Sequence, residues 1–298
     1  MQSKIKNHSI KNNLIDTVEG LELLARRAVQ GLHLGLHHST KTGFGQEFSH
    51  YRNYEPGDDL RLLDWKLYAR TDRFYVRQAE VQTQVTVRFI LDASASMLHE
   101  DSEISKMQFA RYLTATLAWI AQRQGDKIGL YALNNNQLYE CTPHPRRQFY
   151  QYFLQELINI SPQGKFPENK NIHALFDIRP RREIVIFLTD MYQSNDELFE
   201  TLKQLNSMGN EVLLFHLMAA NELNFNFKGT LTFQDLETGK TTQVHTRQAK
   251  ADYQIRLQNH LKNIREKMLG MNIHYELFRM NEPVREAVER FLERRAML

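Results

Sequence analysis

The chain has 298 residues, which is enough for one large domain or two domains of ordinary size. Its 38 basic and 35 acidic residues give a formal charge of +3, too balanced to indicate a nucleic-acid or membrane partner. The single cysteine, Cys141, excludes an internal disulfide and favours a reducing compartment. No apolar run approaches the roughly 20 residues of a membrane helix. We therefore expect a soluble, cytoplasmic protein without membrane insertion.

The first part of the chain is expected to differ from the rest. Residues 1–16 resemble a flexible leader. Residues 17–32 have the apolar spacing of an amphipathic helix. Residues 39–82 are rich in Gly, Asp, Arg and aromatic residues and are only weakly periodic, which predicts short strands and ordered loops. We group 17–82 as an N-terminal helix with a small β-rich subdomain.

A regular alternation of strands and helices begins at Val85. The predicted order is strand 85–91, helix 104–123, strand 127–133, helix 147–159, strand 183–189, helix 196–208, strand 211–217, helix 249–268, strand 272–278 and helix 283–295. This alternation predicts an α/β domain over residues 83–298, with a doubly wound, mostly parallel sheet and helices on both faces. Residues 220–246 interrupt the pattern, and Glu237-Thr238-Gly239-Lys240 indicates a hairpin insertion there.

Two of the predicted strands end in aspartate. The first runs into Asp92-x-Ser94-x-Ser96, and the strand at 183–189 is followed by Asp190. Ligands of open α/β sheets bind beyond the carboxyl ends of the strands, so these side chains form one candidate site. Carboxylate and hydroxyl oxygens suit Mg²⁺, Ca²⁺ or Mn²⁺. The alternative is that each aspartate only caps the helix that follows it.

The segment before the alternation carries an unusual set of residues. The set comprises Arg52, Gly57, Asp58, Asp59, Arg61, Asp64, Trp65 and Arg70. So many Asp and Arg residues predict an ion-pair network. Gly57 predicts a tight turn, and Trp65 predicts an aromatic anchor in a core. We interpret most of this set as a structural scaffold, and a partner-binding surface is the alternative.

The stretch Gly57-Asp58-Asp59-x-Arg61-x-x-Asp64-Trp65, placed before an Asp-x-Ser-x-Ser strand, closely resembles the bacterial family called domain of unknown function 58. The resemblance runs from about residue 15 to the end and includes the hairpin at 235–239. It implies a von Willebrand factor type A-like core, and the strand tip resembles the metal-ion-dependent adhesion site of that fold. It also implies work with a MoxR-type AAA+ ATPase in chaperone-like assembly or maturation of protein complexes.

One loop departs from the pattern of a complete metal site of this type. Such a site also uses a Thr or Asp from a separate loop, but the matching segment here reads Glu168-Asn169-Lys170-Asn171-Ile172-His173. The ammonium group of Lys170 near Asp92 and Asp190 would repel a divalent cation and neutralise the carboxylates. The sequence therefore predicts that binding of Mg²⁺ or another divalent cation is weakened or lost.

The chain has no P-loop, dinucleotide fingerprint or serine-hydrolase elbow. We therefore expect a non-enzymatic protein-interaction module with a protein partner. The alternative is a metal-dependent phosphohydrolase in which Asp92 is the nucleophile, although Ser94 stands where that chemistry normally uses a second Asp as acid/base. Binding to nucleic acid is disfavoured by the near-neutral charge.

Overall fold

The computed structural model describes residues 14–32, 41–43, 47–81, 84–101, 103–146, 148–167, 183–192, 196–227 and 229–296. The chain forms two compact units, one of residues 1–36 with 85–298 and one of residues 37–84. The smaller unit contains an antiparallel sheet in the order β1-β3-β2 and the short α-helix α3. Its elements are β1 (Lys41–Gly43), β2 (Glu47–Asn53), the 3-10 helix η1 (Leu60–Leu62), α3 (Trp65–Thr71) and β3 (Tyr75–Val81).

The larger unit is built on a six-stranded sheet in the order β13-β10-β9-β4-β7-β8. Its strands are β4 (Thr86–Asp92), β7 (Lys127–Leu133), β8 (Leu138–His144), β9 (Ile184–Thr189), β10 (Glu211–Met218) and β13 (His274–Arg279). All neighbouring pairs are parallel except β7 with β8. The chain enters the sheet at the central strand β4 and continues through β7 to the edge strand β8. It then returns to β9, on the other side of β4, and continues through β10 to the opposite edge strand β13. The predicted doubly wound, mostly parallel sheet is confirmed.

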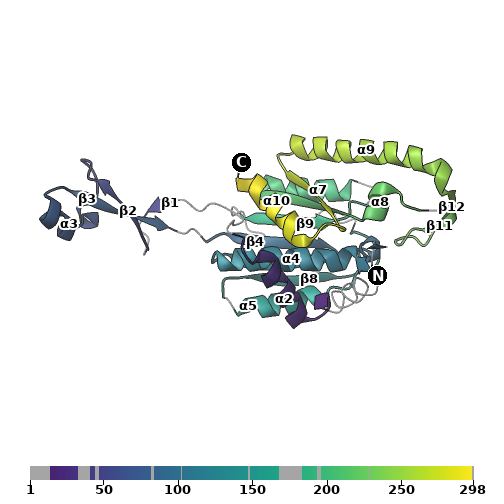
Figure 1. Ribbon diagram of the computed structural model, residues 1–298, viewed down its shortest axis with the longest axis horizontal. Coiled ribbons are helices and arrows are strands. Elements are labelled where there is room, and N and C mark those ends of the chain that lie inside the picture. The colour runs from purple at the N-terminus through teal and green to yellow at the C-terminus, as the bar shows by residue number, and fades with distance from the viewer. Residues whose placement is uncertain are drawn as a thin grey trace. The chain divides into compact units, whose positions relative to one another are not determined.

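Helices cover both faces of this sheet (Figure 1). Side chains alternate between the faces along β4, so Phe89 and Leu91 join one apolar core and Ile90 joins the other. The first core packs under α2 (Val18–Val29), α4 (Lys106–Arg123), α5 (Phe149–Asn159) and α10 (Val284–Ala296). The second packs under α7 (Glu197–Ser207) and α9 (Thr246–Gly270). Helix α2, which the sequence grouped with the β-rich segment, contributes Leu21 and Ala25 to the core of the larger unit.

The sequence analysis missed the edge strand β8. This strand leaves most of its side chains partly or fully exposed, and Cys141 is its buried member. It also contains Pro143, which is tolerated at a sheet edge because a proline cannot donate a ladder hydrogen bond. A short strand with these features lacks the continuous apolar run that marks the buried parallel strands.

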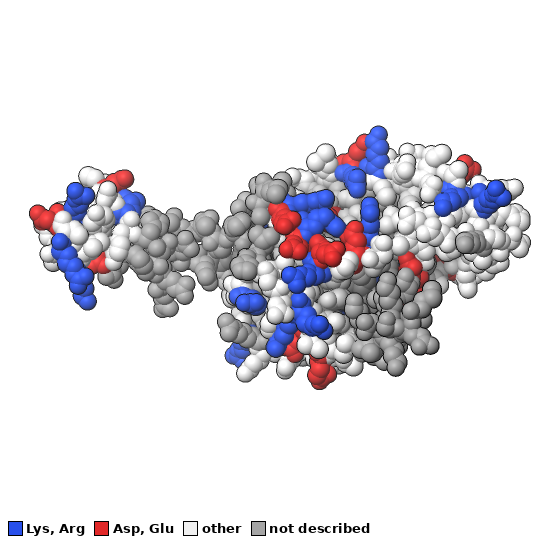
Figure 2. Space-filling model, viewed as in Figure 1, with Lys and Arg blue, Asp and Glu red and all other residues white. Residues whose placement is uncertain are grey.

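A hairpin follows β10 where the sequence indicates one. It consists of β11 (Thr230–Gln234) and β12 (Thr241–His245), and the short helix α8 (Ala220–Asn224) precedes it. No helix in the described ranges is long and apolar enough to cross a membrane. On the face in view, basic and acidic side chains lie interspersed over the larger unit, in keeping with the balanced charge (Figure 2).

Candidate functional site

The candidate site lies at the carboxyl ends of β4 and β9, where the winding direction of the sheet reverses. Leu91 on β4 lies opposite Leu188 on β9, so Asp92 and Thr189 meet at the same end of the sheet. Thr189 donates its hydroxyl to Oδ2 of Asp92 across 2.8 Å. A switch point of this kind is where open α/β sheets bind their ligands.

The structure brings together all four predicted site residues that it describes. The backbone N–H of Ser94 donates to Oδ1 of Asp92 at 2.9 Å. The hydroxyls of Ser94 and Ser96 lie 3.0 Å apart, and Ser96 donates to Oδ1 of Asp190 at 3.1 Å. All four residues are buried. Neither aspartate is the N-cap of the helix that follows it in the described part of the chain: Ser94 precedes the 3-10 helix η2 (Ala95–Leu98), and Asp196 precedes α7.

Burial perturbs the carboxyl group of Asp92. Its exposed fraction is 0%, and this burial, together with the charge of Asp190, raises the pKa of Asp92 to about 6. The hydrogen bonds from Ser94 and Thr189 favour the ionised form and limit the shift. Because burial disfavours the ionised form of this carboxylate, a nearby cation or a bound proton would stabilise it.

A lysine that the sequence analysis did not identify supplies a positive charge at the site. The ammonium nitrogen Nζ of Lys106 lies 3.0 Å from Oδ2 of Asp190 and 2.7 Å from Oε1 of Glu222. Lys106 is only 3% exposed. Burial alone would lower the pKa of Lys106, but the two carboxylates outweigh it and raise that pKa. The side chain therefore remains an ammonium group.

The position of Lys106 at the start of α4 is a sequence feature that could have identified it. Ser105 and Gln108 form a reciprocal capping box, which makes Lys106 the first residue of the helix. A basic side chain is unfavourable at this end because the helix dipole is positive there. Such a lysine needs acidic partners from elsewhere. Lys170, which the sequence places near the two aspartates, lies outside the described residues.

Asp190 is also held through its backbone. Nε2 of His216 lies 3.1 Å from the carbonyl oxygen of Asp190, and Nδ1 lies 2.8 Å from the hydroxyl of Tyr275. Because a carbonyl can only accept, Nε2 carries the hydrogen and Nδ1 accepts from Tyr275. Burial lowers the pKa of His216 to about 3, so the ring is neutral. A neutral histidine thus fixes the loop that presents Asp190.

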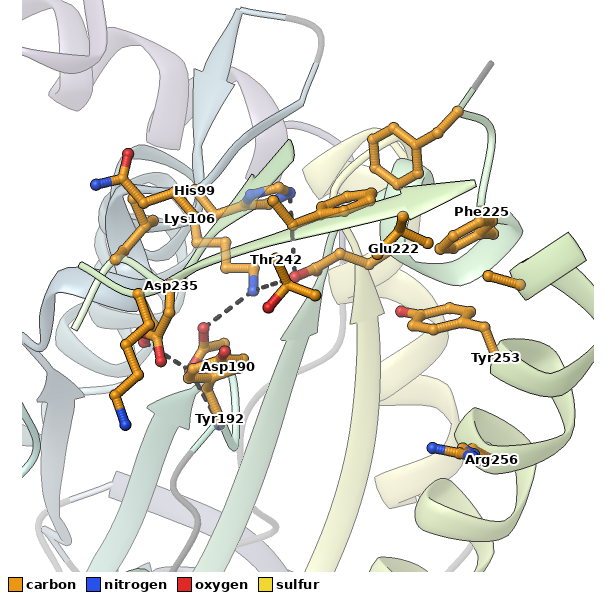
Figure 3. Close-up of a pocket in the computed structure, with 18 of the residues that line it drawn as sticks. His99, Lys106, Asp190, Tyr192, Glu222, Phe225, Asp235, Thr242, Tyr253 and Arg256 are labelled. Carbon is orange, nitrogen blue, oxygen red and sulfur yellow. Dashed lines mark hydrogen bonds and ion pairs between the residues drawn. The ribbon is translucent and has the colours of Figure 1, made fainter. Parts of the chain in front are cut away.

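The strand tips open into a cavity of about 750 Å³ beside the β11–β12 hairpin (Figure 3). Ser96, Lys106 and Asp190 form its polar base. Its apolar wall is a cluster of aromatic rings, Phe225, Phe227, Phe233 and Tyr253. This volume and this mixture of apolar wall and few polar groups are typical of ligand sites.

The donor atoms at the strand tips fit a hard divalent cation. Asp92, Ser94 and Ser96 present only oxygen, the donor that Mg²⁺ prefers. Asp190 adds little, since Lys106 already neutralises it. Among the described residues, no three His, Cys, Asp or Glu side chains are spaced to hold a metal ion. A cation would rest on one carboxylate and two hydroxyls, which is a weak set.

In the smaller unit, the carboxylates of the charged segment hold turns of the backbone. Asp64 caps α3 by accepting two backbone N–H groups at 3.0 Å, and it also accepts the hydroxyl of Tyr51 at 2.8 Å. Asp59 caps η1 through one backbone N–H at 3.0 Å. Gly57 has φ +111°, a backbone conformation that favours glycine in a tight turn.

The arginines and the tryptophan of this segment differ from expectation. Arg52 pairs with Asp58 at 2.7 Å, whereas Arg61 and Arg70 are exposed and form no ion pair with a described residue. The expected dense network is therefore largely absent from the part that the structure describes. The prediction that Trp65 anchors a core is wrong, because its side chain is 59% exposed. The buried carboxylate of Asp64, its neighbour, holds the start of α3 instead.

The sheet order and the oxygen cluster at the strand tips define a doubly wound α/β protein with its candidate site at the switch point. The chain belongs to the family described as "Protein of unknown function DUF58", which matches residues 50–263. Uncharacterised proteins of Mycobacterium bovis and Mycobacterium tuberculosis are 24% identical over 225 residues, covering 74% of this chain and 69% of each relative.

Solved structures of other proteins are similar to this chain. The conserved hypothetical protein BatB from Bacteroides thetaiotaomicron has 15% identity and a TM-score of 0.46, covering 72% of this chain and 100% of that one. An aerotolerance-related membrane protein from Bacteroides fragilis has 17% identity and a TM-score of 0.44, covering 70% and 99%. The VWA domain of SpRpn10 has 11% identity and a TM-score of 0.40, covering 69% and 94%.

Proposed function

We propose that this protein is a non-enzymatic interaction module that works with a MoxR-type AAA+ ATPase in the assembly or maturation of protein complexes. The strand-tip site is the contact point in this proposal. The observation that carries it is the buried oxygen cluster of Asp92, Ser94 and Ser96, of which Ser96 lines a cavity with an aromatic wall. The partner class itself rests on the family resemblance. We place this activity in the cytoplasm.

The arrangement around Asp92 favours binding over catalysis. Both carboxylate oxygens accept hydrogen bonds, one from the backbone N–H of Ser94 and one from the hydroxyl of Thr189, and the side chain is fully buried. A phosphohydrolase nucleophile needs an oxygen free to attack, with an acid/base group close by. Ser94 does not supply that group. Asp92 is better placed to hold a cation or a hydrogen-bond network.

Mg²⁺ or another divalent cation is proposed as a weakly held component of the site. Asp92, Ser94 and Ser96 would hold it, and its positive charge would attract an acidic group of the partner. Lys106 partly takes the place of such an ion at Asp190. We therefore expect an affinity lower than that of a site with two free carboxylates.

A co-purification experiment tests this function. The full chain and its Asp92→Asn variant are incubated with lysate of the source organism, once with Mg²⁺ and once with chelator, and captured proteins are identified by mass spectrometry. We expect a MoxR-type AAA+ ATPase with the wild type in Mg²⁺ and less of it with the variant. Absence of such an ATPase from all four samples would contradict the proposal. Phosphatase activity that depends on Asp92 would favour the enzyme alternative.

A further inference from the structure

Strand β13 is one edge of the six-stranded sheet, and its outer side is open. No strand among the described residues pairs with it on that side, whereas β10 pairs with all six of its residues on the other. Phe278 is the one buried residue of β13, while seven of the eight residues of β10 are buried. The outer side of β13 is therefore accessible to another chain.

The two edges of the sheet differ in their protection against strand pairing. At the opposite edge, β8 contains Pro143, and its register with β7 shifts between Ile128 and Leu130. Prolines and bulges are devices with which natural proteins block pairing at a sheet edge. Strand β13 contains no proline and keeps a regular register with β10. The sheet thus blocks one edge and leaves the other able to accept a strand.

The hydrogen bonds to β10 show which backbone groups of β13 point outward. The N–H of Met280 donates to the carbonyl oxygen of Met218 in β10 at 3.0 Å. Because backbone groups alternate in direction along a strand, the N–H groups of Tyr275, Leu277 and Arg279 point away from β10. No other described residue accepts from these three groups. Free donors at every second residue are what an added strand needs.

A groove of about 690 Å³ lies at this edge, lined by β13, the end of α9 and α10. It has an apolar part on the side of α9. Leu269, in the last turn of α9, is 81% exposed there, and Tyr275 and Leu277 of β13 are half-buried. An added strand would cover these side chains, and removal of apolar surface from water favours its binding.

The groove carries an excess of positive charge. Four arginines and two glutamates line it. Arg290 and Arg294 form ion pairs with these glutamates, at N–O distances between 2.8 and 3.6 Å. Arg265 and Arg279 are exposed and form no ion pair with a described residue. Two guanidinium groups are therefore available for carboxylates, which they bind with favourable bidentate geometry.

We propose that the edge of β13 binds an extended segment of a partner protein by strand addition, and that this segment carries acidic and apolar side chains. Hydrogen bonds to β13 hold its backbone, and the groove selects its side chains. Arg265 and Arg279 bind its carboxylates, and Leu269 contacts its apolar groups. A second copy of this chain fits less well, because it brings the same excess of positive charge. The inference goes beyond the proposed function and does not depend on the strand-tip site.

Peptide binding and hydrogen exchange test this inference on the full chain. The probe is a short fluorescein-labelled peptide of alternating glutamate and valine, and its control has lysine in place of glutamate. Fluorescence anisotropy measures affinity, and hydrogen exchange measures protection of the β13 amides. Leu277→Pro lacks an outward N–H, and Leu277→Ala keeps it. Arg279→Glu reverses a charge of the groove, and Lys250→Glu reverses an exposed charge of α9 outside it. Circular dichroism and light scattering check folding and oligomeric state.

We expect the acidic peptide to bind the wild type and protect the β13 amides, and the lysine peptide to do neither. Arg279→Glu should weaken binding about tenfold, because repulsion replaces attraction, and Lys250→Glu should bind as the wild type. Leu277→Pro should lose binding, and Leu277→Ala should retain the protection of β13. Equal binding by these two variants, or binding without protection of β13, would overturn strand addition. No binding by the wild type, or a dimer that Leu277→Pro abolishes, would overturn the acidic partner.

Discussion

Lys106 and Asp190 form a buried ion pair, with 3.0 Å between Nζ and Oδ2, at the point where the sheet reverses its winding. The two residues come from the first turn of α4 and the end of β9, and Glu222 from α8 completes the group. An ammonium group thus neutralises one of the two strand-tip aspartates. We expect this relationship to govern the stability of the site and, if the proposed cation binds, its affinity.

Replacement of Lys106 by Met should destabilise the fold strongly. Asp190 and Glu222 would lose their common cation, and breaking a buried pair by removing one partner costs about 3–5 kcal/mol. Lys262→Met is the matched control, since Lys262 is exposed and lies 3.8 Å from Glu266. Denaturant unfolding in chelator measures both variants. If Lys106→Met lowers the free energy of unfolding no more than Lys262→Met does, the buried ion pair does not contribute to stability.

Asp92→Asn should stabilise the protein at pH 7 in chelator. The folded-state pKa of about 6 lies above the ordinary 3.8, so ionised Asp92 opposes folding by about 3 kcal/mol at most. We expect the variant to be about 1–3 kcal/mol more stable, because asparagine keeps an acceptor for the N–H of Ser94. The difference should shrink as the pH falls through 6 and vanish near 4. A variant that is less stable at pH 7 would contradict this interpretation.

His216 should make stability fall in mild acid. Its folded-state pKa of about 3 lies below the ordinary 6.5, so the unfolded chain binds a proton first as the pH falls. Its contribution to stability is complete above pH 6.5 and decreases by about 1.4 kcal/mol per pH unit below that value. Unfolding free energies of wild type and His216→Gln between pH 5 and 7.5 give the difference due to this residue. Parallel pH curves would exclude the effect.

The fold could be predicted because its parallel strands are buried on both faces. Residues 184–188 of β9 form a continuous apolar run, and such runs alternating with amphipathic helices leave few other arrangements. The ends of β4 and β9 could also be linked in advance, since ligand sites of such sheets lie at strand ends. The order of the strands, which makes Asp92 a neighbour of Thr189, had to come from the structure.

The residues that contact the strand-tip residues could not be predicted from the sequence. Lys106 is 84 residues from Asp190 and 116 from Glu222, and no short motif joins them. Asp235 and Lys240 line the cavity at the strand tips only because the hairpin folds back toward them. Trp65 was misjudged for a different reason. A small unit has little interior, so even a tryptophan can stay on its surface.

Asp64 and Trp65 allow a direct test of the role of the charged segment in the smaller unit. Asp64→Ala should destabilise this unit by about 1–2 kcal/mol or more, because two helix N–H groups and the Tyr51 hydroxyl lose their acceptor. Trp65→Ala should change its stability by about 0.5 kcal/mol or less, because the side chain is mostly exposed. Hydrogen exchange of the α3 amides in the full chain reports on the smaller unit alone.

The same two variants separate a scaffold from a binding surface. If the segment only holds the fold, Asp64→Ala weakens ATPase capture in proportion to its loss of structure, and Trp65→Ala leaves capture unchanged. If the exposed face of α3 contacts a partner, Trp65→Ala reduces capture while hydrogen exchange in α3 stays as in the wild type. An exposed tryptophan is well suited to such a contact, because Trp is enriched among the residues that dominate binding energy at interfaces.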